Sequence, residues 1–177
     1  MHMPSIAAAI ERATALLRRR PKIGLQDDAP ATACWQEGMR IVTTHQNGTQ
    51  VVTDMPTELG GGSCGVSPGW LFRAGLASCT ATCIAMDAAI AGIELSDLQV
   101  RATSCSDTRG LLGMTEGNGE PVYSGPTNVQ MRVRISAPGI SPDTLKALVE
   151  GGQRKSPIAV AVQDIVRVDM LVDASST

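Results

Sequence analysis

The chain has 177 residues and a mass of 18.5 kDa, which is the size of one domain. Its 15 Lys and Arg residues against 17 Asp and Glu residues give a net charge of −2, which excludes the basic surface of a nucleic-acid-binding or anionic-membrane-binding protein. Aromatic residues make up 2% of the chain, too few for a stacking platform for bases or sugars, whereas 43% of apolar residues is enough for a globular core.

The first predicted element is an amphipathic helix near the N-terminus. Apolar residues recur at helical spacings between Ile6 and Leu17, and Ser5 or Pro4 is expected to cap the helix start. Charged residues interrupt this pattern, so the helix is too polar to cross a membrane. We treat residues 1–24 as a helical extension of the main domain.

Residues 31–55 have the pattern of short antiparallel strands, with turn signals at Gly38 and at the Asn47-Gly48 pair. The glycine-rich stretch 56–68 that follows changes character, because its glycines would cost entropy inside a regular element. It lacks the Gly-Lys-Ser/Thr ending of a phosphate-binding P-loop. We therefore predict a turn that leads the chain into a helix.

A long helix is predicted to begin with Ser67 as the N-cap and Pro68 as the first helical residue, and to end near Gly92. Charged residues are rare in this stretch, and many of its residues are small. We therefore expect a central helix that is buried on most sides and allows close approach of a second element. Its apolar residues recur at spacings of four and three: Phe72, Leu76, Cys79, Cys83, Met86 and Ile90.

Three strands are predicted after the long helix, over residues 95–104, 129–135 and 165–172. Apolar and polar residues alternate in the first two, as they do in a half-buried strand. A glycine-rich connection over residues 107–126 separates these two strands. The third would close the fold.

Two further helices are predicted, and each begins at a serine followed by a proline: Ser141-Pro142 and Ser156-Pro157. The order of the elements differs from the regular alternation of strands and helices in a parallel sheet. We therefore predict an α+β fold in which residues 25–177 form a single domain.

The cysteines show no repeated spacing and follow no signal-peptide pattern, so a secreted disulfide framework is disfavoured. We expect reduced thiols in a cytoplasmic protein. His2 and His45 are far apart and near no Cys-x-x-Cys pair, so we expect no metal site, and we expect no bound cofactor. The five cysteines are Cys34, Cys64, Cys79, Cys83 and Cys105.

Cys79 and Cys83 both lie in the predicted long helix. On periodicity alone, a cysteine in such a helix is more often an inert packing residue than a nucleophile. The sequence contains no Gly-x-Ser-x-Gly motif, so a serine hydrolase is not indicated.

The stretch from Pro56 to Thr80 carries a more specific signal. It begins Pro-Thr-Glu-Leu-Gly-Gly-Gly and continues from Ser67 as Ser-Pro-x-x-Leu-Phe-x-Ala-x-Leu-Ala-Ser-Cys-Thr. This pattern resembles the central signature of the osmotically inducible protein C and organic hydroperoxide resistance family (OsmC/Ohr). The Asp-Thr-Arg-Gly-Leu-Leu-Gly segment that begins at Asp107 agrees with it, and the similarity covers about residues 31–172.

The resemblance implies an OsmC-like fold with antiparallel sheets around a long buried central helix, in an intertwined homodimer. It also implies a thiol-dependent peroxidase that reduces organic or fatty hydroperoxides, with Cys79 as the peroxidatic cysteine. In that chemistry a thiolate attacks the peroxide O–O bond, becomes a sulfenic acid and is restored by another thiol. An apolar surround suits such substrates but raises the pKa of a thiol, so a nearby cation is required.

The sequence departs from the family pattern at three positions. Ser156 stands where the family has its second, resolving cysteine, and we interpret Ser156 as an N-cap. Gly69 replaces the acidic residue that orients the activating arginine. An ungapped match places Glu37 near the position of that arginine, so Arg40 is the candidate for stabilising the thiolate; a solvated arginine at a strand end is the alternative.

Reduction of Cys79 by an external thiol or dithiol is the simplest hypothesis. Cys83 is one turn away, but Cβ atoms at this spacing are about 5–6 Å apart, farther than a disulfide requires. Cys64 and Cys105 are more mobile candidates for resolving the sulfenic acid. Two competing hypotheses are a module of the same fold that binds a small apolar ligand without turnover, and a purely structural dimer.

Overall fold

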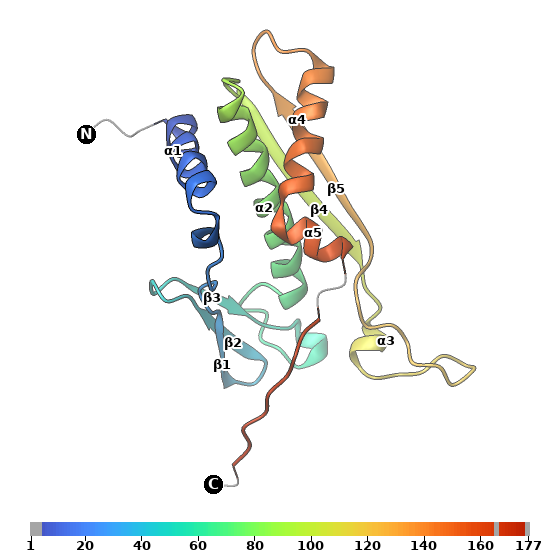
Figure 1. The fold of residues 1–177 in the computed structure, drawn as a ribbon. Coiled ribbons are helices and arrows are strands. Elements are labelled where there is room, and N and C mark those ends of the chain that lie inside the picture. The colour runs from blue at the N-terminus through green and yellow to red at the C-terminus, as the bar shows by residue number, and fades with distance from the viewer. Residues whose placement is uncertain (1–4, 165–166, 176–177) are drawn as a thin grey trace.

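The computed structural model describes residues 5–164 and 167–175 and shows the predicted α+β architecture (Figure 1). The chain opens with α1 (Ile6–Arg19), and the Ser5 hydroxyl caps this helix by accepting a backbone hydrogen bond at 3.3 Å, as predicted. The short 3-10 helix η1 (Pro21–Gly24) follows. No helix among the described residues is both long and apolar enough to cross a bilayer.

The first sheet consists of three antiparallel strands in the order β1, β2 and β3. Gly38 and Gly48 form the predicted turns between them, with φ angles of 53° and 89° that side-chain-bearing residues rarely adopt. Every residue of β1 is exposed, and in the described chain the sheet makes no extensive contact with any other element. The strands are β1 (Thr32–Glu37), β2 (Arg40–Thr44) and β3 (Gln50–Thr53).

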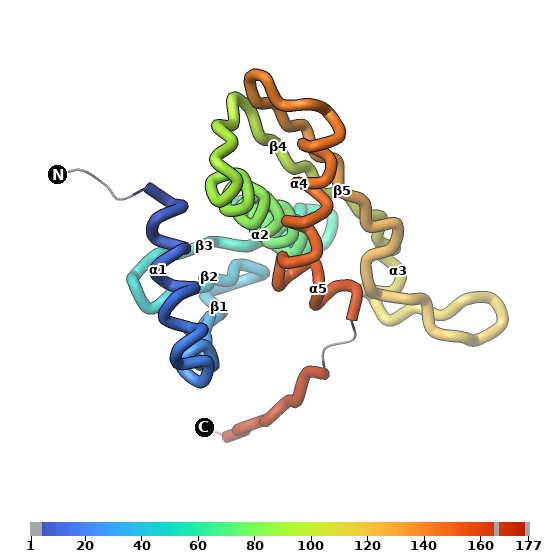
Figure 2. The backbone as a smooth tube through the Cα atoms, turned by 45° about the horizontal axis from the view of Figure 1, so that its top comes forward, coloured from blue at the N-terminus to red at the C-terminus, as the bar shows by residue number. Residues whose placement is uncertain are grey.

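The long helix α2 (Pro68–Ile90) follows the short 3-10 helix η2 (Thr57–Leu59) and runs through the middle of the molecule (Figures 1 and 2). The Ser67 hydroxyl accepts a hydrogen bond from the Trp70 amide at 3.2 Å, which confirms the predicted N-cap. The predicted start of this helix and its end close to Gly92 are therefore confirmed.

The second sheet is the antiparallel pair β4 (Asp97–Cys105) and β5 (Thr127–Ser136), which confirms the first two strands predicted after the long helix. The excursion between them carries the single-turn helix α3 (Thr108–Leu111). After β5 come α4 (Pro142–Lys155) and α5 (Pro157–Gln163), which begin at the predicted Ser-Pro pairs. The helix α2 packs against both α4 and β4.

One face of α2 supplies the core: Leu76, Thr80, Ile84 and Ala88 are buried. This stripe agrees with the predicted apolar stripe only at Leu76, and Ile90 at the end of the predicted stripe is 57% exposed. The physical reason is the close approach of α4, because a Cβ on Gly152 would lie 2.6 Å from Cγ1 of Ile84. Packing against α4, rather than the apolar period of α2 itself, selects the buried face.

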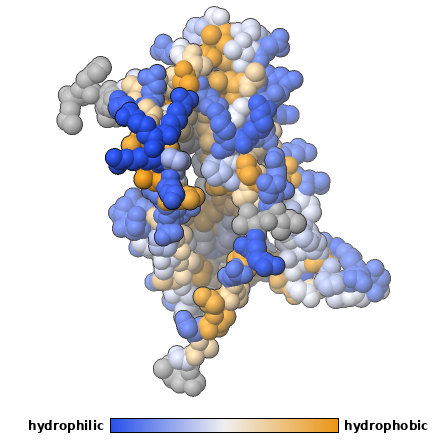
Figure 3. Space-filling view, viewed as in Figure 1, coloured by the Kyte–Doolittle hydropathy of each residue, from blue (hydrophilic) through white to orange (hydrophobic). Residues whose placement is uncertain are grey.

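The predicted closing strand is wrong for residues 167–172, which form no strand; residues 165–166 lie outside the described residues. The segment runs away from the body of the molecule, and apolar side chains gather on it at the lower end of Figure 3. Leu171 is 96% exposed. A strand requires a hydrogen-bonded neighbour, and none of the described sheets includes this segment.

Candidate active site

Cys79 lies on the third turn of α2 and is half-buried, with a free thiol. At 1.5 Å per residue, it is about 17 Å from Pro68, where the helix starts. The electrostatic influence of a helix N-terminus falls off within its first turn, so the helix dipole contributes little to a thiolate at this position.

Cys83 lies one turn after Cys79 and is also half-buried and free. Burial raises the pKa of Cys83, and the neighbouring Cys79 and the Asp87 carboxylate raise it further, as does a hydrogen bond to Cys79. Lys155 acts in the opposite direction and forms an ion pair with Asp87. Burial, Cys79 and Asp87 therefore all favour the neutral thiol form of Cys83.

Arg40 is exposed at the start of β2, where it pairs with Glu37 across the hairpin. Its charge acts on the pKa of Cys64, opposing the larger effect of the hydrogen bond to Asp54, which raises that pKa. None of the ion pairs among the described residues includes Arg40. A single chain thus brings Arg40 toward Cys64, and a role at Cys79 stays a prediction.

Asp54 is a residue that the sequence did not single out, and it organises the glycine-rich loop ahead of α2. Its carboxylate is 4% exposed and accepts hydrogen bonds from the amides of Met55, Gly62 and Cys64 at 2.7, 3.0 and 3.1 Å. A hydrogen bond from the Cys64 thiol, together with these amides, lowers the pKa of Asp54. A Cβ on Gly61 would lie 1.8 Å from the Met55 carbonyl oxygen, so only glycine fits there.

The amides of Gly62 and Cys64 already donate hydrogen bonds to the Asp54 carboxylate, so they are not available to bind a phosphate. This confirms the prediction of a turn that leads into the helix. The signal available in the sequence was an aspartate shortly before a glycine-rich turn, since aspartate side chains often accept hydrogen bonds from nearby backbone amides.

Ser156, which the family resemblance predicts to stand at the position of a resolving cysteine, is fully buried, and its hydroxyl contacts Thr80 of α2. Its hydroxyl accepts hydrogen bonds from the Ala159 amide and from the Thr80 hydroxyl, both at 3.4 Å. The first of these caps α5, which confirms the predicted N-cap. Because Thr80 directly follows Cys79, position 156 adjoins the turn of α2 that carries Cys79, but a hydroxyl cannot form a disulfide.

A cavity of about 890 Å³ opens beside the first turns of α2, between the η2 loop, the end of β4 and α3. Phe72 and Arg73 line it from the helix. The Nη1 atom of Arg73 donates a hydrogen bond to the hydroxyl of Ser104 on β4 at 3.2 Å. Cys79 and Cys83 do not line the cavity.

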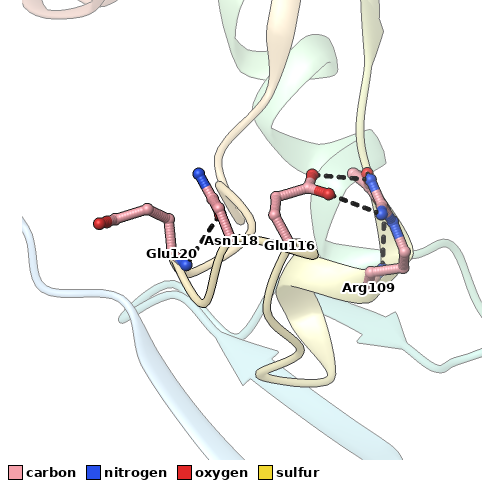
Figure 4. A network of polar contacts seen from close by, with 5 residues as sticks. Arg109, Glu116, Asn118 and Glu120 are labelled. Atoms are coloured by element: carbon pink, nitrogen blue, oxygen red, sulfur yellow. Dashed lines mark hydrogen bonds and ion pairs between the residues drawn. The ribbon is translucent and has the colours of Figure 1, made fainter.

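Arg109 in α3 forms ion pairs with the carboxylates of Asp107 and Glu116; Figure 4 labels Arg109 and Glu116. Its Nη2 atom lies 2.6 Å from Asp107 and 3.1 Å from Glu116. These partners raise the pKa of Arg109, and Arg109 in turn lowers the pKa of Asp107. Asn118 accepts a hydrogen bond from the Glu120 amide in the same excursion (Figure 4). Arg109 therefore orders the excursion between β4 and β5 and is not free to pair with a thiolate.

The stretch from Pro56 to Thr80 suggested a relationship to a known family, and comparison with family models tests it. The family model for OsmC-like proteins matches residues 60–170, which is more than half of the chain. The chain belongs to the OsmC family. None of the curated protein sequences matches it.

Solved structures share the fold of this OsmC family member. An OsmC-like protein from Mycoplasma pneumoniae has a TM-score of 0.65 and 18% identity, over 80% of this chain and 91% of that chain. An OsmC-like protein of unknown function from Vibrio cholerae has a TM-score of 0.62 and 15% identity, over 78% and 95%. An organic hydroperoxide resistance protein OsmC from Legionella pneumophila has a TM-score of 0.56 and 21% identity, over 78% and 91%.

Proposed function

We propose that this OsmC family member is a thiol-dependent peroxidase that reduces organic hydroperoxides with Cys79 as its single peroxidatic cysteine. The observation that carries the proposal is the free, half-buried Cys79 thiol on the central helix α2. The family signature before and around Cys79 supports it, as does the printed name of the Legionella pneumophila relative, an organic hydroperoxide resistance protein.

The Cys79 thiolate attacks one oxygen of the hydroperoxide, the O–O bond breaks, and Cys79 becomes a sulfenic acid. The leaving alkoxide takes up a proton and departs as an alcohol. The Cys83 thiol, one turn away on α2, would donate a hydrogen bond to the Cys79 thiolate before the attack. Arg40 is our candidate for a stabilising cation, which it would supply across a subunit boundary.

Ser156 in place of a resolving cysteine favours a reductant from outside the chain over Cys64 or Cys105. An external thiol attacks the sulfenic acid, releases water and leaves a mixed disulfide on Cys79. A second thiol, or the other thiol of a dithiol, then attacks that disulfide, so Cys79 is reduced and the reductant leaves as a disulfide.

We also propose that the working unit is a homodimer. The chain exposes 13628 Å², whereas a compact monomer of this mass exposes about 8,200 Å². Much of the excess lies on elements that lack extensive packing within the described chain: the β1–β3 sheet and the segment 167–175. A second copy that covers these surfaces predicts a solution mass of about twice 18.5 kDa.

The peroxidase proposal is tested by treating the folded protein with one equivalent of cumene hydroperoxide in the presence of dimedone, followed by intact-mass analysis and peptide mapping. We expect one dimedone adduct, on Cys79, and none in Cys79→Ser. The matched control is Cys105→Ser, which removes an exposed thiol and should label as the parent protein does. An adduct on another cysteine, or none on Cys79, would contradict the proposal.

The second candidate function is a non-catalytic module that binds a small apolar ligand. Two differences from the family pattern favour this function: the resemblance places Ser156 where the family has its resolving cysteine, and Gly69 where it has an acidic residue. It predicts that Cys79 stays unlabelled in folded protein and that a lipid or metabolite co-purifies with the chain. The same mass analysis therefore distinguishes the two functions.

A further inference from the structure

The cavity beside the first turns of α2 holds an arginine that lacks a carboxylate partner. Arg73 is half-buried, and none of the ion pairs in the described part of the chain includes it. Its hydrogen bond, at 3.2 Å, goes to the neutral hydroxyl of Ser104. A guanidinium that is partly removed from water is stabilised by an anion, and here the protein supplies none.

Two nearby positions explain why Arg73 has no internal counter-ion. Gly69 precedes it by one helical turn, and a Cβ at Gly69 would lie 3.7 Å from Nη1 of Arg73. An acidic side chain at this spacing could pair with the arginine, but glycine has none. Asp107, an acidic residue of the cavity wall, is already bound to Arg109 at 2.6 Å.

Apolar side chains form much of the rest of the cavity wall, including Leu59, Phe72 and Leu111. Ala102 and Ser104 of β4, which lie on the less exposed side of this strand, complete the wall opposite Arg73. A volume of about 890 Å³ falls within the range of small-molecule binding sites, which combine apolar walls with a few polar groups that fix orientation.

We infer that this cavity binds a small amphipathic anion, with Arg73 holding a carboxylate-type head and the apolar wall enclosing the body of the molecule. The inference goes beyond the proposed peroxidase activity, because Cys79 and Cys83 do not line the cavity. Binding is expected to persist in Cys79→Ser, so its failure and the failure of the peroxidase proposal are separate results.

The test is titration calorimetry of the full chain with octanoate and with octanamide, which has the same chain length and no charge. Octanoate is expected to bind at least tenfold more tightly than octanamide. Arg73→Met keeps an apolar stem and removes the charge, so it is expected to weaken octanoate binding about tenfold to a hundredfold and leave octanamide unchanged. Arg132→Met is the matched control, because Arg132 faces Arg101 across β4 and β5 but lies outside the cavity lining.

Gly69→Glu is a second variant that keeps Arg73 in place. The new carboxylate would compete with octanoate for the guanidinium, and acidic residues are well tolerated in the first turn of a helix. We expect this variant to weaken octanoate binding and to spare octanamide. Equal affinity for the two probes, equal loss of both in Arg73→Met, or no octanoate binding because a second copy fills the cavity would overturn the inference.

Discussion

The unit formed by α2, α4, α5 and the β4–β5 pair is packed within one chain, whereas the β1–β3 sheet and the segment 167–175 are not. In the packed unit, Leu76 and Ile84 are buried where α2 meets α4 and α5. In the open part, every residue of β1 is exposed, and Leu171 is 96% exposed. The contrast shows that the packed unit is stabilised within the chain, whereas the open part lacks a packing partner among the described residues; the homodimer proposed above would supply one.

Gly152→Val tests the packed unit and has the largest expected effect. A Cβ at this position would lie 2.8 Å from the backbone nitrogen of Ile84, so α2 and α4 would have to separate. We expect the free energy of unfolding to fall by about 3 kcal/mol or more, measured by urea denaturation at a fixed protein concentration. Gly151→Ala is the matched control, because its Cβ would make an ordinary contact of 3.4 Å with Asp87. Equal effects of the two variants would show that the helix contact is looser than the structure indicates.

Met170→Asp tests the open part. Met170 is 82% exposed in one chain, so a charge there should have little effect on an isolated monomer. If a second copy covers residues 167–172, burying an unpaired carboxylate should raise the dimer dissociation constant at least tenfold, measured by sedimentation equilibrium. Asp169→Asn, on the neighbouring position, is the control. An unchanged dissociation constant in Met170→Asp would place the dimer contact elsewhere.

Asp54→Asn tests the junction between the two parts. The carboxylate raises the pKa of Cys64 through their hydrogen bond, so its loss should speed alkylation of Cys64 by iodoacetamide at pH 8 severalfold. Because the pKa of Asp54 is lowered on folding, its stabilising contribution is present above the unfolded-state pKa of about 3.9 and is lost as the pH falls through the folded value. The variant should therefore show a weaker loss of thermal stability at acid pH.

Cys105 is exposed and serves as the internal control for the alkylation, which is followed by peptide mapping. Its rate should be the same in both proteins. A Cys64 rate that does not change would mean that the Asp54 carboxylate does not govern the reactivity of this thiol.

Arg109→Gln has the smallest expected effect on stability, because its partners Asp107 and Glu116 are exposed and such ion pairs contribute little. The local effect should be clearer: loss of the network that orders residues 112–121 should speed cleavage there in limited proteolysis. Arg132→Gln, an exposed arginine without an ion pair among the described residues, should leave the cleavage pattern unchanged.

Helix starts could be predicted because the interactions that fix them lie within a few residues. Ser67, Ser141 and Ser156 each accept a hydrogen bond from an amide three residues later and precede a proline that is suited to the first helical position. The family signature is likewise a local pattern, and it identified the OsmC family before any fold was known. Both depend on contiguous sequence, which is why the sequence was sufficient for them.

The sequence by itself determined the order of the longer helices and strands as far as α5, the α+β class and the family. Only the tertiary structure decided which face of α2 is buried, that Asp54 fills the glycine-rich loop, and that Arg73 lies unpaired in a cavity. It also decided that residues 167–172 form no strand in a single chain. The physical reason is range: caps and turns are set by neighbouring residues, whereas burial, ion pairing and strand formation require a partner segment from elsewhere in the fold.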